Sequence, residues 1–143
     1  MVTPANRGFP RTARLLRPAE FASVYDRRQS AASGPLVVYA AANGLAGGGV
    51  RLGLSVSRRI GSAVVRNRWK RRLREAFRMV RSALPPATDL VIVVRSGAPP
   101  VGAEGAAWLR ETIMAVSKRI VSRPGFGKFA GEAAPRPRRR GGA

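Results

Sequence analysis

The stretch VVRNRWKRRLREAFRMVRS, residues 64–82, has the clearest periodicity in the chain. On a helical wheel of about 100° per residue, its apolar side chains fall on one stripe. The stripe consists of Val65, Trp69, Leu73, Ala76, Phe77 and Val80. The opposite face consists of Asn67, Lys70, Arg71, Arg74, Arg78 and Arg81. The pattern predicts a central amphipathic helix that packs its apolar stripe on the core and presents a basic face outward.

This basic face is dense and of one sign. Ten basic residues and a single acid, Glu75, lie between Arg58 and Arg81. Like charges four residues apart destabilise a helix by about 0.2–0.5 kcal/mol per pair, so the face opposes the helix that carries it. A polyanion would offset that repulsion. A solvated surface helix is the alternative, but the charge density favours a face that binds nucleic acid.

Composition limits both the size of the fold and its chemistry. A chain of 143 residues with 45% hydrophobic content can bury one modest core. Its net charge of +20 makes nucleic acid the leading partner. The absence of Cys and His excludes disulfides, thiolate metal sites and the commonest general base. Neither a signal peptide nor a membrane span is evident, so we expect a soluble, cytoplasmic protein with no membrane partner.

An enzyme acting alone is hard to build from this chain. Two-metal phosphodiester cleavage needs convergent carboxylates, whereas the seven acids here are scattered without a shared motif. A serine nucleophile would lack its usual histidine base, and no phosphate-binding Gly-x-x-x-x-Gly-Lys-Ser/Thr loop occurs. We therefore expect no catalytic residue, metal site or small-molecule cofactor in the polypeptide.

The remaining elements surround the central helix, for which Ser62 is a plausible N-cap. We expect a first helix from Pro18 to about Arg28, a polar loop at 29–34, and a strand at 36–42. A glycine-rich hairpin connection at 43–49 would pair that strand with an alternating strand at 50–57. A run apolar on both faces, at 89–95, predicts an inner strand, and a last helix spans 104–121. The tails, residues 1–13 and 123–143, are basic and expected to be disordered.

These elements define an α/β (α+β) sandwich in which helices pack on one sheet, in the order α-β-β-α-β-α. Residues 14–122 form the single domain. Recognition of single-stranded RNA would need aromatic side chains near a positive surface, because bases stack on aromatic rings. The candidates are Phe21, Tyr25 and Tyr39. Periodicity alone would place Phe21 and Tyr25 in the core, and the sequence leaves this choice open.

One long segment, residues 51–78, resembles a known family. It contains a Gly-Leu-Ser-Val-Ser strand at 53–57, a basic Arg-Arg-Ile-Gly turn at 58–61, and Arg-Asn-Arg at 66–68 followed by further basic positions on the helix. This ordered set closely resembles the protein subunit of bacterial ribonuclease P, and the similarity covers about residues 14–121. An Arg-Asn-Arg triplet alone would not be specific.

The resemblance implies a ribonucleoprotein endoribonuclease that removes the 5′ leader from precursor tRNA. A catalytic RNA subunit would perform the hydrolysis with bound Mg²⁺. The protein would bind that RNA through Arg58, Arg59, Arg66, Asn67, Arg68, Lys70, Arg71 and Arg74. It would hold the single-stranded leader between the first helix and the sheet, through Phe21, Tyr25 and Tyr39. The family's mixed sheet also has a left-handed β-α-β crossover around the central helix, whereas about 98% of such crossovers are right-handed.

Two residues depart from the family pattern. Tyr25 replaces a common Phe, which keeps the ring and adds a hydroxyl. Trp69 replaces an aliphatic residue, and its place on the apolar stripe predicts core packing rather than base stacking. Two other functions remain open on the sequence alone: a ribosomal or RNA-chaperone protein without a linked reaction, and a nuclease that needs no RNA subunit.

Overall fold

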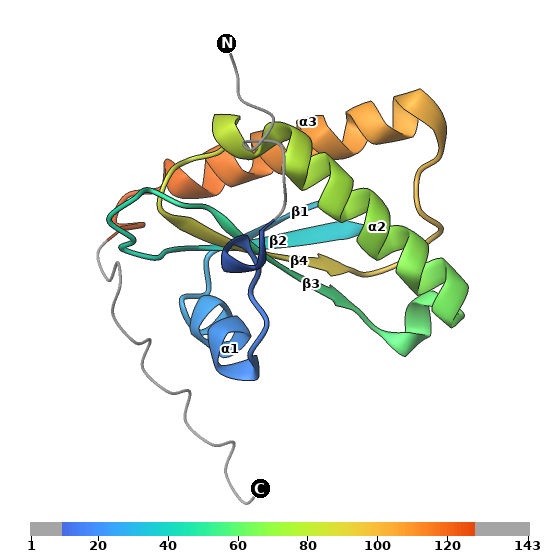
Figure 1. Cartoon of the computed structure of the whole chain (residues 1–143), viewed down its shortest axis with the longest axis horizontal. Helices are drawn as coiled ribbons and strands as arrows, with labels where there is room; N and C mark the ends of the chain where they lie inside the picture. The colour runs from blue at the N-terminus through green and yellow to red at the C-terminus, as the bar shows by residue number, and fades with distance from the viewer. Residues whose placement is uncertain (1–9, 128–143) are drawn as a thin grey trace, which may run out of the picture.

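The computed structural model describes residues 10–127. Its helices lie on both faces of a single sheet, with α2 and α3 on one face and α1 on the other (Figure 1). The helices are α1 (Pro18–Asp26), α2 (Ala63–Val80) and α3 (Gly102–Val121). The strands are β1 (Ser30–Ser33), β2 (Leu36–Ala42), β3 (Arg51–Val56) and β4 (Thr88–Val94). The predicted α+β sandwich is therefore confirmed.

The sheet has the strand order β1-β2-β4-β3, so β4 lies between β2 and β3. Strand β4 runs antiparallel to β2 and parallel to β3, and its Ile92 lies opposite Val38 of β2 and Leu54 of β3. This confirms β4 as an inner strand. The predicted hairpin between 36–42 and 50–57 was wrong, because β4 separates these strands. Six of the seven β4 residues are buried, and an inner position covers both of their faces.

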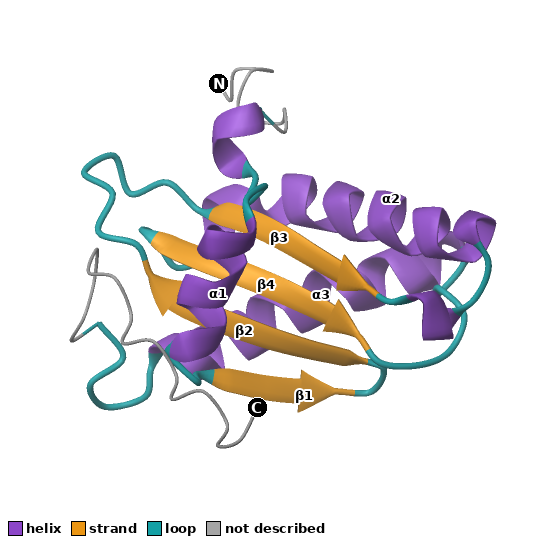
Figure 2. Cartoon of the chain, turned by 90° about the horizontal axis from the view of Figure 1, so that it is seen from below, coloured by secondary structure: helices purple, strands orange, loops and turns teal. Residues whose placement is uncertain are grey.

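The crossover from β3 through α2 to β4 is left-handed, as the family resemblance implied. Figure 2 views the sheet from the α1 side: β3 and β4 point in the same direction, and α2 passes behind the sheet between them. When Figure 2 is turned so that β3 and β4 point upward, the helix lies behind the sheet and β4 lies to the right of β3. The general preference for right-handed crossovers would have predicted the opposite hand.

The predicted loop at 29–34 was also wrong. Ser30–Ser33 forms the edge strand β1, which pairs with β2 through a tight turn at Gly34, where φ is 54°. Its sequence, SAAS, does not alternate between hydrophobic and polar residues. The strand needs no such alternation, because it is held mainly by backbone hydrogen bonds to β2. Arg123 extends the attachment by donating a 2.8 Å hydrogen bond to the Ser30 carbonyl.

The main core lies between the sheet and the α2–α3 layer. Five residues of the predicted α2 stripe are buried: Trp69, Leu73, Ala76, Phe77 and Val80. Trp69 is fully buried, and its indole Nε1 donates a 3.0 Å hydrogen bond to the Gly97 carbonyl. This confirms that Trp69 is a core residue. Ser62 caps α2 as predicted, its hydroxyl accepting a hydrogen bond from the Val65 amide.

Residues on both sides of the predicted range 14–122 also pack against the fold. At the N-terminal side, Ala13 is buried in a short 3-10 turn, and the Leu15 amide donates a 2.9 Å hydrogen bond to the Leu52 carbonyl of β3. At the C-terminal side, Arg123 donates a hydrogen bond to Gln29 Oε1. The rest of the two predicted tails, residues 1–9 and 128–143, lies outside the described residues.

Candidate nucleic-acid interface

The outward face of α2 forms the wall of a basic groove. The groove has a volume of about 390 Å³ and is lined by Arg14, Asn67, Lys70, Arg71, Arg74, Glu75 and Arg78. Four of these residues belong to the predicted RNA-binding set. Arg14 comes from the segment that runs beside β3, where its backbone bridges to Leu52. The groove therefore combines charges from two segments that are far apart in the sequence.

Three of the cations in this groove have no carboxylate partner among the residues that the structure describes. Arg78 forms an ion pair with Glu75, and this hydrogen bond lowers the pKa of the Glu75 carboxyl and raises the pKa of Arg78. Within residues 10–127, Lys70, Arg71 and Arg74 form no ion pair with a carboxylate. Three cations on adjacent turns of one helix face create a strong positive potential, which favours a polyanionic ligand.

The other predicted basic residues lie around the start of α2. Arg58 and Arg59 are exposed in the 3-10 turn η3 (Arg58–Ile60), which leads into the helix. Arg66 is partly buried and its Nε donates a 3.3 Å hydrogen bond to the Gly61 carbonyl. Arg68 is exposed on the side of α2 that faces α3. The predicted set thus covers the turn and two sides of α2 rather than a single stripe.

The predicted leader-binding aromatics lie on the opposite side of the sheet, with α1. Tyr25 of α1 and Tyr39 of β2 contact edge to face, with ring centroids 4.9 Å apart and an interplanar angle of 86°. Phe21 lies over β3, where a Cβ at Gly53 would stand 2.7 Å from the Phe21 Cζ. All three side chains are partly exposed. We call Phe21, Tyr25 and Tyr39 the aromatic face.

This arrangement leaves part of the sheet open. In Figure 2, α1 crosses one end of the strands, and none of the helices within residues 10–127 covers the carboxyl ends of β3 and β4 on this side. Burial raises the pKa of the Tyr25 phenol above its usual range, while a hydrogen bond with Ser55 of β3 acts in the opposite direction. The Tyr25 hydroxyl therefore stays protonated at neutral pH and can donate a hydrogen bond.

A charged cluster attaches α1 to the sheet. Glu20 Oε1 accepts hydrogen bonds from the amides of Leu16 and Arg17, and its Oε2 lies 3.6 Å from Arg51 Nη1. Arg51 also pairs with Asp89 of β4. The hydrogen bond from the Arg17 amide is the main cause that lowers the pKa of Glu20. The hydrogen bond from the Leu16 amide and the positive charge of Arg51 lower it further. Arg51 therefore connects Glu20 of α1 to Asp89 of β4, and this connection holds the helix that carries Phe21 and Tyr25 against the sheet.

Among residues 10–127, no three His, Cys, Asp or Glu side chains gather closely enough to hold a metal ion. No helix in the same part of the chain is both long and apolar enough to cross a membrane.

Three basic residues near these surfaces were not predicted to bind RNA. Arg14 lines the basic groove, while Arg72 and Arg110 line a second pocket between α2 and α3. The position of Arg72 within the basic run could have indicated it. Arg110 lies on a different helix, in a segment without a charge run, and only the packing of α3 against α2 brings it near.

An α+β fold with a basic helix face on one side and partly exposed aromatics on the other defines the class: a small RNA-binding protein. Comparison with known proteins agrees with this class. Residues 9–120 match the family model described as Ribonuclease P. The ribonuclease P protein component of Brevibacillus brevis is 40% identical over 110 residues, which cover 76% of this chain and 83% of that protein.

Solved structures give the same result. The ribonuclease P protein of Staphylococcus aureus has a TM-score of 0.62 and 30% identity, over 75% of this chain and 94% of that one. The Thermotoga maritima protein has a TM-score of 0.59 and 28% identity, over 74% and 96% of the two chains. The chain belongs to the ribonuclease P protein family. It is thus a protein subunit of ribonuclease P, the ribonucleoprotein endonuclease of tRNA 5′ processing.

Proposed function

We propose that the two sides of the sheet bind two different RNAs. The α2 face, including the basic groove and the η3 turn, binds the catalytic RNA subunit. The aromatic face binds the single-stranded 5′ leader of precursor tRNA. The RNA subunit performs the hydrolysis with Mg²⁺ that it holds itself, and the complex acts in the cytoplasm. The protein thereby strengthens the binding of precursor over mature tRNA.

One observation carries this proposal: the unneutralised cations of α2 and the aromatic side chains of α1 and β2 lie on opposite faces of one sheet and meet at its β3 edge. A small hollow of about 110 Å³ at this edge is lined by Phe21 together with Lys70 and Arg74. Two strands of RNA could therefore bind at the same time and approach each other along β3. Phosphates would pair with the guanidiniums, and unstacked bases would contact the rings.

The experiment is reconstitution with and without each component. Purified protein, the RNA subunit and precursor tRNA are combined at low Mg²⁺, and release of the leader is measured. We expect cleavage by the RNA subunit to rise when the protein is added, and no cleavage by the protein alone. If the protein binds RNA but leaves the cleavage rate unchanged, the chain acts as an RNA chaperone. Cleavage without the RNA subunit would identify a self-sufficient nuclease.

A further inference from the structure

A pocket of about 340 Å³ lies between α2 and α3, beside the basic groove, with which it shares Arg71 and Glu75. Its floor is apolar and consists of Ala76 from α2 with Ala106 and Leu109 from α3. The two alanines leave room between the helices, and Leu109 is only 1% exposed. Arg68, Arg72 and Arg110 surround the floor. We call this the α2–α3 pocket.

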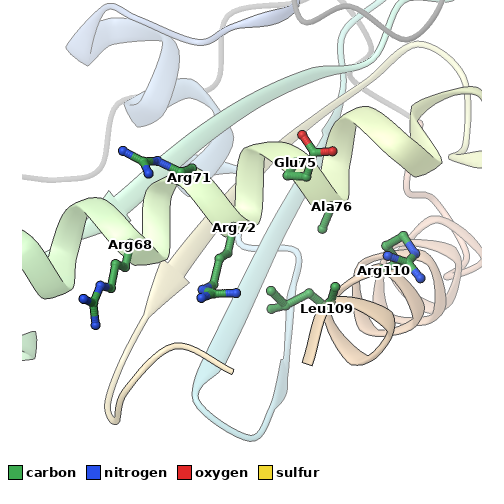
Figure 3. A pocket seen from close by; sticks show the side chains of 8 residues that line it. Arg68, Arg71, Arg72, Glu75, Ala76, Leu109 and Arg110 are labelled. Carbon is green, nitrogen blue, oxygen red and sulfur yellow. The ribbon is translucent and has the colours of Figure 1, made fainter. Parts of the chain in front are cut away.

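The arginines around this pocket come from both helices. In Figure 3, the Arg72 side chain extends from α2 toward Leu109, and Arg110 extends from α3 on the other side of the floor. Arg71 and Glu75 contribute to the lining, but their charged ends point away, toward the other side of α2. Glu75 is already paired with Arg78. Within residues 10–127, Arg68, Arg72 and Arg110 form no ion pair with a carboxylate.

An apolar floor ringed by guanidiniums restricts the kind of ligand. Phosphate alone would need the charges but not the floor, and an apolar ligand would need the floor but not the charges. A nucleotide uses both, because its base has two apolar faces and its phosphate is anionic. Guanidinium groups pair with phosphate and also stack on bases. The volume falls within the range of about 300–1,000 Å³ that is usual for small-ligand sites.

We propose that the α2–α3 pocket takes one unstacked nucleotide of the catalytic RNA subunit, with the base against Ala106 at the apolar floor and its phosphates on Arg72 and Arg110. The inference rests on the proposed function, because it assumes that α2 docks on that RNA. The position of the pocket indicates that the nucleotide belongs to the RNA subunit rather than to the tRNA leader. Arg71 lines both this pocket and the basic groove, so the two sites form one continuous surface. The proposed leader site lies on the other face of the sheet, with α1 (Figure 1).

A cross-linking experiment tests where the nucleotide comes from. The chain has no cysteine, so Ala106→Cys introduces a single thiol that can carry a short photoreactive aryl azide. The assembled complex, with RNA subunit and leader-bearing tRNA, is irradiated and the cross-links are mapped. We expect Ala106→Cys to cross-link to one discrete site on the RNA subunit. The matched control, Ala115→Cys, is exposed on α3 outside the pocket and should give weak or scattered cross-links. Cross-links from position 106 to the tRNA, or none above the control, would overturn the proposal.

A binding experiment distinguishes the contacts that the pocket makes with the base from those that it makes with the phosphate. Ala106→Trp fills the floor and leaves every charge in place, so affinity for the RNA subunit should fall at least about fivefold with an unchanged salt dependence. Arg72→Ala with Arg110→Ala should lower both the affinity and the salt dependence. The controls, Ala115→Trp and Arg119→Ala, should bind like the unmodified protein.

The outcomes distinguish this inference from the proposed function. If the unmodified protein binds the RNA subunit and stimulates cleavage while all pocket variants match their controls, the nucleotide pocket is wrong and the proposed function stands. If the unmodified protein does not bind the RNA subunit, both are wrong. Thermal unfolding identifies variants that fail to fold. Arg72 and Arg110 are only partly buried, so we expect their truncation to disturb the core less than Ala106→Trp, and this pair decides the matter if Ala106→Trp unfolds.

Discussion

Arg51 and Asp89 are directly opposite each other in the parallel β3–β4 pair, and their side chains form two hydrogen bonds. Arg51 Nε and Nη2 donate to Asp89 Oδ1 and Oδ2 over 2.8 and 2.7 Å. The side-chain Nδ2 of Asn43 donates a third hydrogen bond to Asp89, at Oδ1. Arg51 also lies 3.6 Å from Glu20, so this pair connects the sheet to α1. The position of the aromatic face therefore depends on a charged cluster beside it.

Removing the acid from this pair should destabilise the domain. Asp89 is 7% exposed, and Asp89→Ala would remove the three hydrogen bonds that it accepts, leaving Arg51 with Glu20 and Asn43 with the Gly49 carbonyl. Hydrogen bonds to charged groups contribute about 1.5–3 kcal/mol, so we expect a loss of that order in the free energy of unfolding, measured in urea. The double variant Arg51→Met with Asp89→Leu removes both charges of the pair, although Glu20 then loses Arg51, and should lose less. Equal losses for the single and double variants would contradict this explanation.

Glu20 should make stability depend on pH in the acidic range. Its folded-state pKa is lowered below the ordinary value of 4.5, so its stabilising effect is fully present above that value. The effect is lost as the pH falls through the lower folded-state pKa, because protonation weakens the bonds to the Arg17 and Leu16 amides and the attraction to Arg51. Between about pH 7 and about pH 3, the melting temperature of the unmodified protein should fall more than that of Glu20→Gln. Glu111→Gln, on the exposed side of α3, is the control, and parallel curves for all three proteins would rule out this role.

The elements predicted correctly are those with a strong local pattern. The apolar stripe and Ser62 cap predict α2, and the doubly apolar run at 89–95 predicts an inner strand, because in both cases burial acts on consecutive residues. The strand β1 was not predicted because SAAS pairs with β2 through its backbone, and backbone pairing does not require a particular type of side chain. Strand order was wrong because no local pattern records that β4 lies between β2 and β3. The left-handed crossover came from the family resemblance alone.

The same distinction applies to the site. Charge density on α2 pointed to an RNA-binding face, and within residues 10–127 only Arg78 of α2 pairs with a carboxylate. Arg110 could not be predicted, because its relation to Arg72 depends on how α3 packs against α2 rather than on spacing in the sequence. The aromatic residues were ambiguous between core and surface, and the structure explains why. Phe21, Tyr25 and Tyr39 are each partly buried and partly exposed, which is why the periodicity of the first helix predicted a core position for Phe21 and Tyr25.

Gly53 should control the position of the Phe21 ring. A Cβ at this position would lie 2.7 Å from Phe21 Cζ and 3.1 Å from Leu15 Cβ, so Gly53→Ala must displace the ring. Overpacking of this kind costs about 1–3 kcal/mol of folding stability, measurable by urea unfolding. Adding Phe21→Leu should recover part of the loss. Gly47→Ala is the control, since a Cβ there meets no atom within 4 Å. If Gly53→Ala is as stable as this control, the ring does not depend on the glycine.

Phe21 should also discriminate precursor from mature tRNA. Base stacking on an aromatic ring contributes about 1–3 kcal/mol, so Phe21→Ala should reduce the ratio of the two affinities about 5- to 150-fold. The affinity of the protein for the RNA subunit should change little. Phe126→Ala, which removes a ring packed against the core on the α3 side, is the matched control. An unchanged ratio in the Phe21 variant would assign the residue to packing alone.

The central claim is that phosphates of the RNA subunit pair with the cations on α2, and the salt dependence of binding tests it most directly. The dissociation constant for the RNA subunit is measured over a series of salt concentrations. The proteins compared are the unmodified chain, Arg71→Ala with Arg74→Ala, and the charge-matched control Lys118→Ala with Arg119→Ala on α3. Each lost phosphate contact should reduce the log–log slope by about 0.7–0.9, so the α2 variant should lose about 1.4–1.8 in slope and bind more weakly. The control should keep the slope of the unmodified protein. Equal slopes for all three proteins would contradict the claim.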